Sequence, residues 1–177
     1  RINKAFNKNK EKQSVIVSHQ QHSFPKKEIL LLKETMIRLG IRKDNFLTNE
    51  RLLLIECLYN SGIIILHIMK GKDKINAINI LLKKSPREFM FWIDLFDDSQ
   101  MINISSYINF MKSTSLEQSV IINFGRGRYF YKVSNFVPEF HKLHQMYIFS
   151  NKWQKLMFLI VNQIRNLLLS MYKKIKK

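Results

Sequence analysis

The clearest chemical pattern in the sequence is the stretch Phe124–Lys132, in which arginines, aromatic residues and glycines alternate. Glycines allow a close backbone approach, and Arg126 and Arg128 can each form paired hydrogen bonds with a phosphate. The aromatic rings offer surfaces on which unpaired bases can stack. The glycine spacing does not form a dinucleotide-binding fingerprint, because the third glycine is missing. The pattern therefore predicts contact with RNA, and the alternative is a strand whose arginines face water.

Further basic residues follow this stretch and extend the predicted contact with phosphate. We expect the RNA-binding residues to be Arg126, Arg128, Lys132, His141, Lys142, His144, Lys152, Lys155, Lys173, Lys174, Lys176 and Lys177. His141 and His144 stand beside Glu139 and could instead form a metal pair, but no second cluster would complete the coordination shell. No metal site and no cofactor is therefore expected.

Residues that could support catalysis are few. Asp94, Asp97 and Asp98 form a short acidic cluster. Carboxylates can bind a hard cation, but without a partner histidine or a glycine-rich loop a solvated face is the preferred interpretation. The sequence also lacks a Walker loop, a nucleophile elbow, paired zinc ligands and a convincing carboxylate dyad. The sequence therefore predicts a protein that is not an enzyme.

The net charge favours a polyanionic partner. The chain has 177 residues, and 30 Lys and Arg against 13 Asp and Glu give a formal net charge of +17. Such an excess opposes folding through repulsion, so RNA or DNA is the preferred partner, ahead of an anionic membrane. The longest apolar runs, at 63–69 and 156–161, are shorter than the roughly 20 residues of a spanning helix. The single cysteine, Cys57, excludes an intramolecular disulfide and is expected to be buried on a helix face.

The elements that must position these residues begin with a mainly helical N-terminal part. Residues 1–22 are basic and lack periodicity, which indicates an extended arm or a cleaved transit peptide. Helices are predicted at Lys26–Leu39 and, with Thr48 as N-cap, at Asn49–Asn60. The β-branched run Ile63–Met69 predicts one buried strand.

Two further helices are predicted from local signals in the next segment. Asp73 can cap a helix that runs through Leu82. Ser85-Pro86-Arg87-Glu88 has the form of a capping box with proline at the first helical position, which predicts a helix over Phe89–Phe96. The acidic cluster would end this second helix.

The C-terminal part has a strand–turn–strand–helix pattern. Gln145–Phe149 and Trp153–Val161 predict a β-hairpin, because Asn151 tolerates the left-handed conformation of a tight turn. Asn162–Lys173 regains helical spacing. With a boundary near residues 113–119, the predicted domains are a basic extended arm (1–22), a mainly helical extension (23–112) and an RNA-binding domain (113–177).

The segment Ser134–Phe140 resembles a signature of small-subunit ribosomal protein family nineteen, in which a Pro-Glu-aromatic triplet follows two aliphatic residues. Downstream, Ser150-Asn151-Lys152 resembles the family's turn, Leu156–Val161 its apolar strand, and Leu169–Tyr172 the end of its last helix. Asn151 replaces the turn glycine of the family.

The resemblance implies an α+β fold, with a small antiparallel sheet flanked by helices in the C-terminal part and a mostly helical N-terminal extension. It also implies a structural protein in the head of the small ribosomal subunit. The partners would be ribosomal RNA and neighbouring head proteins, without a membrane span or homo-oligomer. Because Ile, Asn, Lys and Phe have AT-rich codons and are abundant, a divergent mitochondrial form is expected.

Two alternatives stay open at this point. Lys27–Leu30, Leu39–Ile41 and Leu47–Thr48 loosely resemble small-subunit ribosomal protein family thirteen. The second alternative is a basic accessory subunit of an organellar inner-membrane complex, which would use its charge on cardiolipin-rich surfaces.

Overall fold

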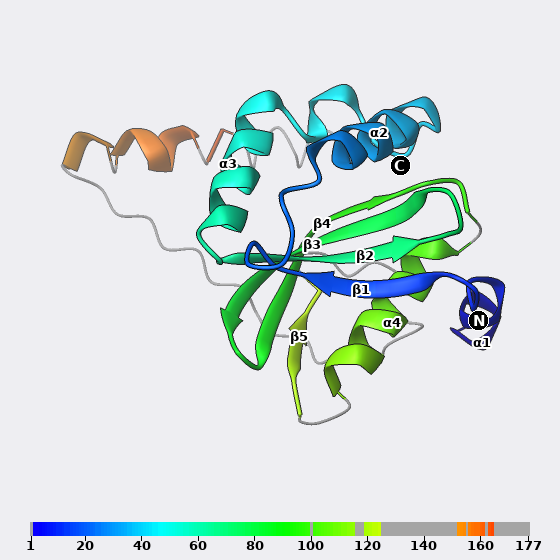
Figure 1. Ribbon diagram of the computed structural model, residues 1–177. Coiled ribbons are helices and arrows are strands. Elements are labelled where there is room, and N and C mark those ends of the chain that lie inside the picture. Colours follow the sequence, from blue (N-terminus) through cyan, green and yellow to red (C-terminus); the bar gives the residue numbers. More distant parts are fainter. Residues whose placement is uncertain are drawn as a thin grey trace. The chain divides into compact units, whose positions relative to one another are not determined.

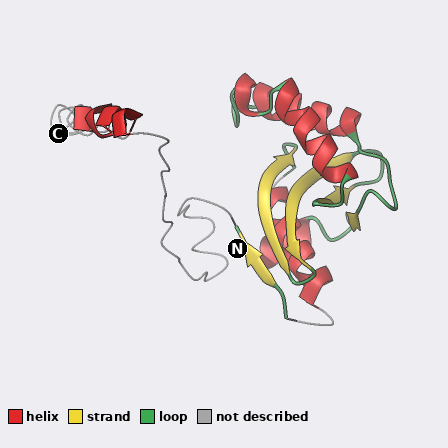
Figure 2. Cartoon of the chain, turned by 90° about the vertical axis from the view of Figure 1, so that its left-hand side faces the viewer, coloured by secondary structure: helices red, strands yellow, loops and turns green. Residues whose placement is uncertain are grey.

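A computed structural model of the chain describes residues 2–99, 101–115, 119–124, 152–154, 156–161, 163 and 164. The chain divides into two units, Arg1–Pro138 and Glu139–Lys177, and each is described by itself. The first unit holds a five-stranded sheet with helices on both faces (Figure 1, Figure 2). Its elements are α1 (Ile2–Lys8), β1 (Gln13–Val17), α2 (Lys26–Arg38), η1 (Asp44–Phe46), α3 (Asn49–Asn60), β2 (Ile64–Lys70), β3 (Ile75–Ser85), β4 (Glu88–Phe96), α4 (Ile102–Ser115) and β5 (Ile121–Asn123).

The five strands follow chain order across the sheet, and one strand pair differs from the rest. β1, β2, β3 and β4 are antiparallel neighbours, whereas β5 runs parallel to β4. A parallel pair needs a crossover connection, and α4 provides it here. The carboxyl end of β4 and the amino end of α4 therefore lie at the same end of the sheet.

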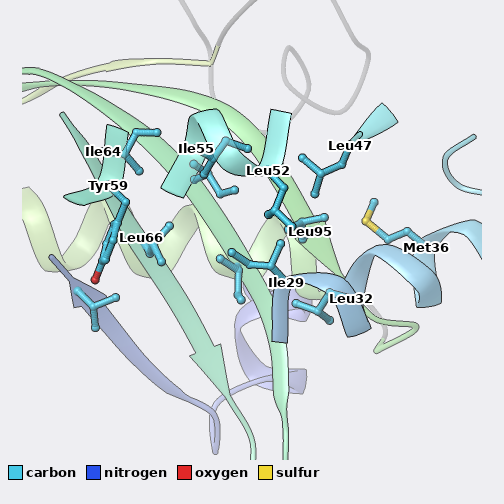
Figure 3. Packing of buried hydrophobic residues seen from close by; sticks show 13 residues of the cluster. Ile29, Leu32, Met36, Leu47, Leu52, Ile55, Tyr59, Ile64, Leu66 and Leu95 are labelled. Carbon is cyan, nitrogen blue, oxygen red and sulfur yellow. The ribbon is translucent and has the colours of Figure 1, made fainter. Parts of the chain in front are cut away.

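α2 and α3 cover one face of the sheet and enclose the larger core. Ile29 and Leu32 of α2 and Ile55 of α3 pack over Leu66 of β2 and Leu95 of β4 (Figure 3). Full burial of an aliphatic side chain of this size stabilises a fold by about 2 kcal/mol. The spacing of the apolar residues on the helices directs them toward the sheet.

α4 covers the opposite face with an aromatic core. The Phe110 ring makes edge contacts with Phe89 and Phe91 at centroid distances of 5.5 and 5.3 Å. Tyr107 contacts Phe91 in the same way at 4.8 Å. Edge-to-face pairs of this kind add about 1 kcal/mol each beyond burial. α1 packs on α4 through Ala5, so the N-terminal segment belongs to this layer.

Several local predictions from the sequence are confirmed. α2 and α3 occupy the predicted ranges, and β2 lies in the predicted β-branched run. The Thr48 side chain accepts a hydrogen bond from the Arg51 backbone N–H at 3.3 Å and so caps α3. Gly40, at φ +67°, follows the end of α2 in the left-handed conformation of a helix stop.

The two helices predicted between Asp73 and Phe96 are wrong, because this segment forms β3 and β4. The Ser85 hydroxyl accepts from the Arg87 backbone N–H at 3.2 Å, so its local bond serves a turn instead of a helix cap. Glu88 pairs with Ser85 across the hairpin and forms an ion pair with Lys84 at 2.8 Å. Both strands are rich in β-branched and aromatic residues, and their pairing outweighs the capping signal.

Two predictions for the N-terminal half also need correction. Residues 1–22 are not an extended arm, because they contain α1 and β1, and β1 pairs with β2 along its whole length. The β-branched run Val15-Ile16-Val17 is the local signal for this edge strand. Cys57 is exposed, because the buried face of α3 passes through Leu52, Ile55 and Tyr59 instead.

In the second unit, residues 152–154, 156–161, 163 and 164 are helical. The strand predicted at Trp153–Val161 is therefore wrong, and so is its likeness to the apolar strand of ribosomal family nineteen. Periodicity alone does not separate a short apolar strand from a helix. Gln145–Phe149 and the end of the predicted last helix lie outside the described residues.

The predicted α+β class is confirmed. The sheet, however, is mixed and lies between Gln13 and Asn123, so the segment predicted to be mainly helical contains three of its strands. The predicted domain boundaries themselves stay a prediction. Within the part of the chain that the structure describes, no helix has the length and apolar character needed to cross a membrane.

Candidate functional site

The candidate site lies at the edge of β4 beyond its short pairing with β5. Glu88, Phe89 and Met90 of β4 pair with Ile121, Ile122 and Asn123 of β5. Among the described residues, no strand pairs with this edge from Trp92 to Phe96. An unpaired strand edge presents backbone N–H and C=O groups that can bind an extended ligand. In sheets with parallel strands, ligands bind beyond the carboxyl ends of the strands. The unpaired edge from Trp92 to Phe96 lies at the carboxyl end of β4.

A β-bulge marks the same place. Ile80 of β3 pairs with Ile93, whereas the next residue, Leu81, pairs with Phe91, so Trp92 is an extra residue in β4. A bulge disrupts the ladder locally, re-aims side chains and is common beside active sites. Here it lies two residues after Met90, the last residue of β4 that pairs with β5.

Beyond the bulge, Asp94 forms a polar pair with α4. The Tyr107 hydroxyl donates a hydrogen bond to Asp94 Oδ2 at 2.6 Å. Tyr107 is 2% exposed, so this bond forms beneath the helix. Phe124, directly after β5, stacks on Phe91 with 5.5 Å between ring centroids and an interplanar angle of 3°. An aromatic wall therefore adjoins the polar pair.

The loop between β4 and α4 is held by a buried carboxylate. Asp97 is 5% exposed, accepts a hydrogen bond from Asn76 Nδ2 at 2.7 Å and pairs with Lys74 Nζ at 2.8 Å. Burial would raise the pKa of Asp97, but hydrogen bonds from Lys74, Ser99 and Asn76 outweigh it and lower this pKa. Met101, the residue before α4, has φ +60°, a conformation that favours glycine. A loop that holds such a residue is tightly determined by its surroundings.

A second buried polar cluster lies under α4 at the middle of the sheet. His67 of β2 is fully buried, and its Nε2 lies 2.7 Å from Ser14 Oγ. Its Nδ1 lies 3.3 Å from Asn79 Nδ2 and 3.2 Å from Ser106 Oγ. Because the Asn79 amide nitrogen can only donate, Nδ1 accepts and Nε2 carries the proton that it donates to Ser14. Burial lowers the pKa of His67 from 6.5 to about 4.

This tautomer decides what the cluster can do. A histidine that activates a serine needs a free lone pair on the nitrogen facing the hydroxyl. In His67 that nitrogen carries the hydrogen, so Ser14 is an acceptor and not an activated nucleophile. The cluster is therefore a structural network that joins β1, β2, β3 and α4.

The acidic cluster predicted from the sequence is partly corrected by the structure. A solvated face is the wrong interpretation for Asp94 and Asp97, because Asp94 bonds to Tyr107 and Asp97 is buried. Asp98 alone is exposed. No group of three potential metal-ligating side chains occurs among the described residues.

The residues predicted to bind RNA are not brought together in the part of the chain that can be described. Lys152 is exposed and helical. The others lie outside the described residues, namely Arg126, Arg128, Lys132, His141, Lys142, His144, Lys155, Lys173, Lys174, Lys176 and Lys177.

The polar groups under α4 are not predicted from the sequence. His67 and Asn79 each interrupt an apolar strand, and this interruption was the available signal. A polar residue inside a buried strand needs a partner from another element. Tyr107 and Ser106 gave no comparable signal, because α4 itself was not predicted.

Comparisons with known proteins give a fold but no family. The sequence matches no family model and no curated protein. Among solved structures, the C-terminal domain of a putative lysylphosphatidylglycerol synthetase from Agrobacterium fabrum is similar, with a TM-score of 0.54 at 10% identity. The match covers 70% of this chain and 40% of that chain, so this chain spans less than half of that structure.

A second similar structure is an aminoglycoside acetyltransferase from an uncultured soil metagenomic sample, in complex with sisomicin. Its TM-score is 0.53 at 10% identity, and the match covers 80% of this chain and 98% of that chain. At such identities the likeness shows the fold alone.

These comparisons correct the functional predictions made from the sequence. The fold is similar to acetyltransferase structures and not to ribosomal protein family nineteen, so that resemblance is wrong. The structural role in the ribosome, the ribosomal RNA and head-protein partners and the prediction of a non-enzyme are wrong with it. The mitochondrial location stays a prediction. The fold, with β5 parallel to β4 and α4 as the helix that connects them, is thus similar to that of an acetyltransferase structure.

Proposed function

We propose that this chain is an acyltransferase that binds an activated acyl donor along the edge of β4. The observation that carries the proposal is this edge, which follows a bulge and a short parallel pair in a fold similar to acetyltransferase structures. The printed names of both similar structures also concern the attachment of an acyl group, acetyl in one and lysyl in the other.

The β4 edge suits a donor that carries amide groups. An extended amide chain can add to a sheet edge as a further strand, with backbone hydrogen bonds on one side. The segment Trp92–Phe96 provides this edge among the described residues. The bulge at Trp92 releases backbone groups from the ladder, where an acyl carbonyl could accept a hydrogen bond.

Asp94 is the candidate for proton transfer. Acyl transfer to an amine or a hydroxyl requires a group that accepts the proton of the attacking atom. Asp94 is the carboxylate on β4 after the bulge, and the Tyr107 hydroxyl fixes its Oδ2 at 2.6 Å. Tyr107 would act as a positioning residue, since it is buried beneath α4.

Coenzyme A thioesters are common acyl donors, and their diphosphate would be expected at the amino end of α4. The residues present do not fit a diphosphate there. The connecting loop contains Asp97 and Asp98, it has no glycine or basic residue, and Lys74 is already paired with Asp97. Two carboxylates would repel the phosphates. We therefore assign no step to coenzyme A.

The proposal is tested by a transfer assay with a panel of donors. The purified full chain would be incubated with radiolabelled acetyl coenzyme A or with labelled aminoacyl esters, in the presence of a polyamine or an aminoglycoside. We expect label to move to an acceptor from at least one donor. Asp94→Asn should lower the rate by about tenfold or more, in line with the loss of a general base.

A matched control is available on the opposite face of the sheet. The Tyr59 hydroxyl on α3 donates to the His22 carbonyl at 2.9 Å, far from β4 in sequence and on the other layer. Tyr107→Phe removes the hydroxyl that positions Asp94 and should lower the transfer rate. Tyr59→Phe also removes one buried hydroxyl but should leave the transfer rate unchanged. Failure to transfer or bind any donor of the panel would refute the proposed function.

A further inference from the structure

A lysine-rich pocket lies at the end of the sheet away from the β3–β4 hairpin. It has a volume of about 460 Å³. Its lining comes from the end of α1, the α1–β1 loop and the β2–β3 turn, namely Asn7, Lys8, Asn9, Lys10, Glu11, Lys12, Gly71 and Lys72. The pairing of Gln13 with Lys70 holds these two connections side by side. α1 leads directly into β1 at this end of the sheet (Figure 1).

The α1–β1 side of the pocket is built on a buried asparagine. Asn9 is 3% exposed, and its Nδ2 donates to the Ala5 carbonyl at 3.1 Å, which closes the end of α1. The Lys12 backbone N–H donates to the Asn9 carbonyl at 3.1 Å, so the loop folds back on itself. This loop therefore presents Lys10 and Lys12 from a fixed backbone.

The opposite side of the pocket is a close-packed turn. The Gly71 N–H donates to the Lys74 carbonyl at 2.9 Å. A Cβ on Gly71 would lie 2.8 Å from Asn76 Oδ1, so a larger residue there would require the Asn76 side chain to shift. Asn76 also donates to Asp97, which ties this turn to the loop before α4. Lys72 therefore projects from a rigid turn.

The side chains that line this pocket carry more positive than negative charge. Four lysines line it against one carboxylate, Glu11. Ion pairs between described residues join Lys26 to Glu56, Lys74 to Asp97 and Lys84 to Glu88, and Lys10, Lys12 and Lys72 take part in none of these. Ammonium groups that outnumber the nearby carboxylates repel one another and create a positive potential that an anion would relieve.

We propose that this pocket binds a small ligand that carries two or more phosphate groups. Lysine ammonium groups are effective phosphate binders as point charges. A volume of about 460 Å³ lies in the range of small-molecule sites, roughly 300–1,000 Å³. The ligand is either a free polyphosphate compound or the phosphorylated headgroup of a lipid. This inference does not depend on the proposed acyl transfer.

The test is calorimetric titration of the full chain with inorganic tripolyphosphate and, separately, with inositol trisphosphate as the headgroup probe. The pocket variant is Lys10→Gln with Lys12→Gln and Lys72→Gln. We expect it to bind tripolyphosphate about tenfold more weakly or worse, since three charge contacts are lost. Tighter binding of inositol trisphosphate, together with sedimentation on phosphatidylcholine vesicles only when they contain phosphatidylinositol bisphosphate, would identify the lipid source.

The matched control removes the same charge elsewhere. Lys27, Lys43 and Lys83 are exposed and lie outside the pocket. The triple variant Lys27→Gln, Lys43→Gln and Lys83→Gln should bind within about twofold of the unsubstituted chain, because only long-range charge is altered. Equal weakening in both triple variants would overturn the proposal, because binding would then follow net charge. Absence of calorimetric binding to the unsubstituted chain would also overturn it.

Discussion

His67 makes the stability of the first unit depend on pH in a way that can be calculated. The imidazole is fully buried beneath α4, with Ser14, Asn79 and Ser106 as its hydrogen-bonding partners and Phe110 at its edge. None of these neighbours carries a charge that would stabilise imidazolium. The nearest carboxylate in the same row of the sheet is Asp94, which pairs with Asn79 across β3 and β4.

The sign and size of the effect follow from the pKa of His67. Burial lowers it from 6.5 to about 4, so between these values the unfolded chain binds more protons than the folded chain. The free energy of unfolding therefore rises with pH through this window, and its His67 contribution is fully present only above the unfolded value. The full contribution is roughly 3 kcal/mol, and about 2 kcal/mol of it is lost when the pH falls from about 7.5 to about 5.

Urea unfolding at the two pH values measures this contribution. Carboxylates also titrate near the lower pH, so the useful quantity is the difference between the unsubstituted chain and His67→Gln. The unsubstituted chain should lose about 2 kcal/mol more than the variant, equivalent to a midpoint change of about 1 M urea. His22→Gln, at an exposed position, is the matched control.

Parallel pH profiles for the unsubstituted chain and the His67→Gln variant would refute the account of His67. If the variant does not fold, the imidazole proton resonances of the unsubstituted chain can be followed by NMR. If every histidine resonance of the folded chain titrates with a midpoint near 6.5, the account of His67 is also refuted. One histidine must stay neutral down to about pH 4.

Two further predictions concern single contacts. Thr48→Ala should lower the free energy of unfolding by about 1 kcal/mol in urea titration, because the Arg51 N–H loses its cap, whereas Thr48→Ser should retain most of it. Asp97→Ala should lower the free energy of unfolding by about 2 kcal/mol above pH 5 and by less in acid. The pKa of Asp97 is lower in the folded chain than its unfolded value of 3.8, so the ionised carboxylate stabilises the fold above that value and loses this effect as the pH falls. An Asp97→Ala penalty that stays constant down to pH 2 would contradict the assignment.

The sequence predicted those elements whose signals are local. α2 has an apolar stripe and a glycine stop, and α3 has the Thr48 cap, so both were found with nearly correct bounds. β2 is predicted correctly because a β-branched run bounded by turn residues favours a strand whatever its partners in the sheet are. In each case the residues that determine the element lie within the element or beside it.

The hairpin of β3 and β4 could not be predicted in this way. Ser85-Pro86-Arg87-Glu88 satisfies the local pattern of a helix start, yet Ser85 pairs with Glu88 and the flanking strands pair over their length. The strand pairing also joins β3 to β2, a partner that no capping pattern encodes. Tertiary pairing thus overrides a local signal, which is the usual limit of propensity arguments.

The candidate site shows the same limit at the level of chemistry. Asp94 and Tyr107 come from a strand and a helix that were both unpredicted, so their hydrogen bond could not be anticipated. The three aspartates are evident in the sequence, but the sequence predicts a solvated acidic face for them. The fold gives these three aspartates different surroundings. Asp97 anchors a loop, Asp94 bonds to α4 and only Asp98 is exposed.

The net charge, too, predicts a specific binding site only when the fold shows which lysines lie together. A total of +17 indicates a polyanionic partner but does not distinguish a nucleic acid from a small phosphate-bearing molecule. Lys10 and Lys12 precede β1, and Lys72 follows β2, so only the pairing of these two strands places them around one pocket. The two triple variants therefore have the same net charge and differ only in whether charge is removed from the pocket or from distant positions. A ligand that distinguishes the two triple variants is therefore recognised by the fold and not by the composition.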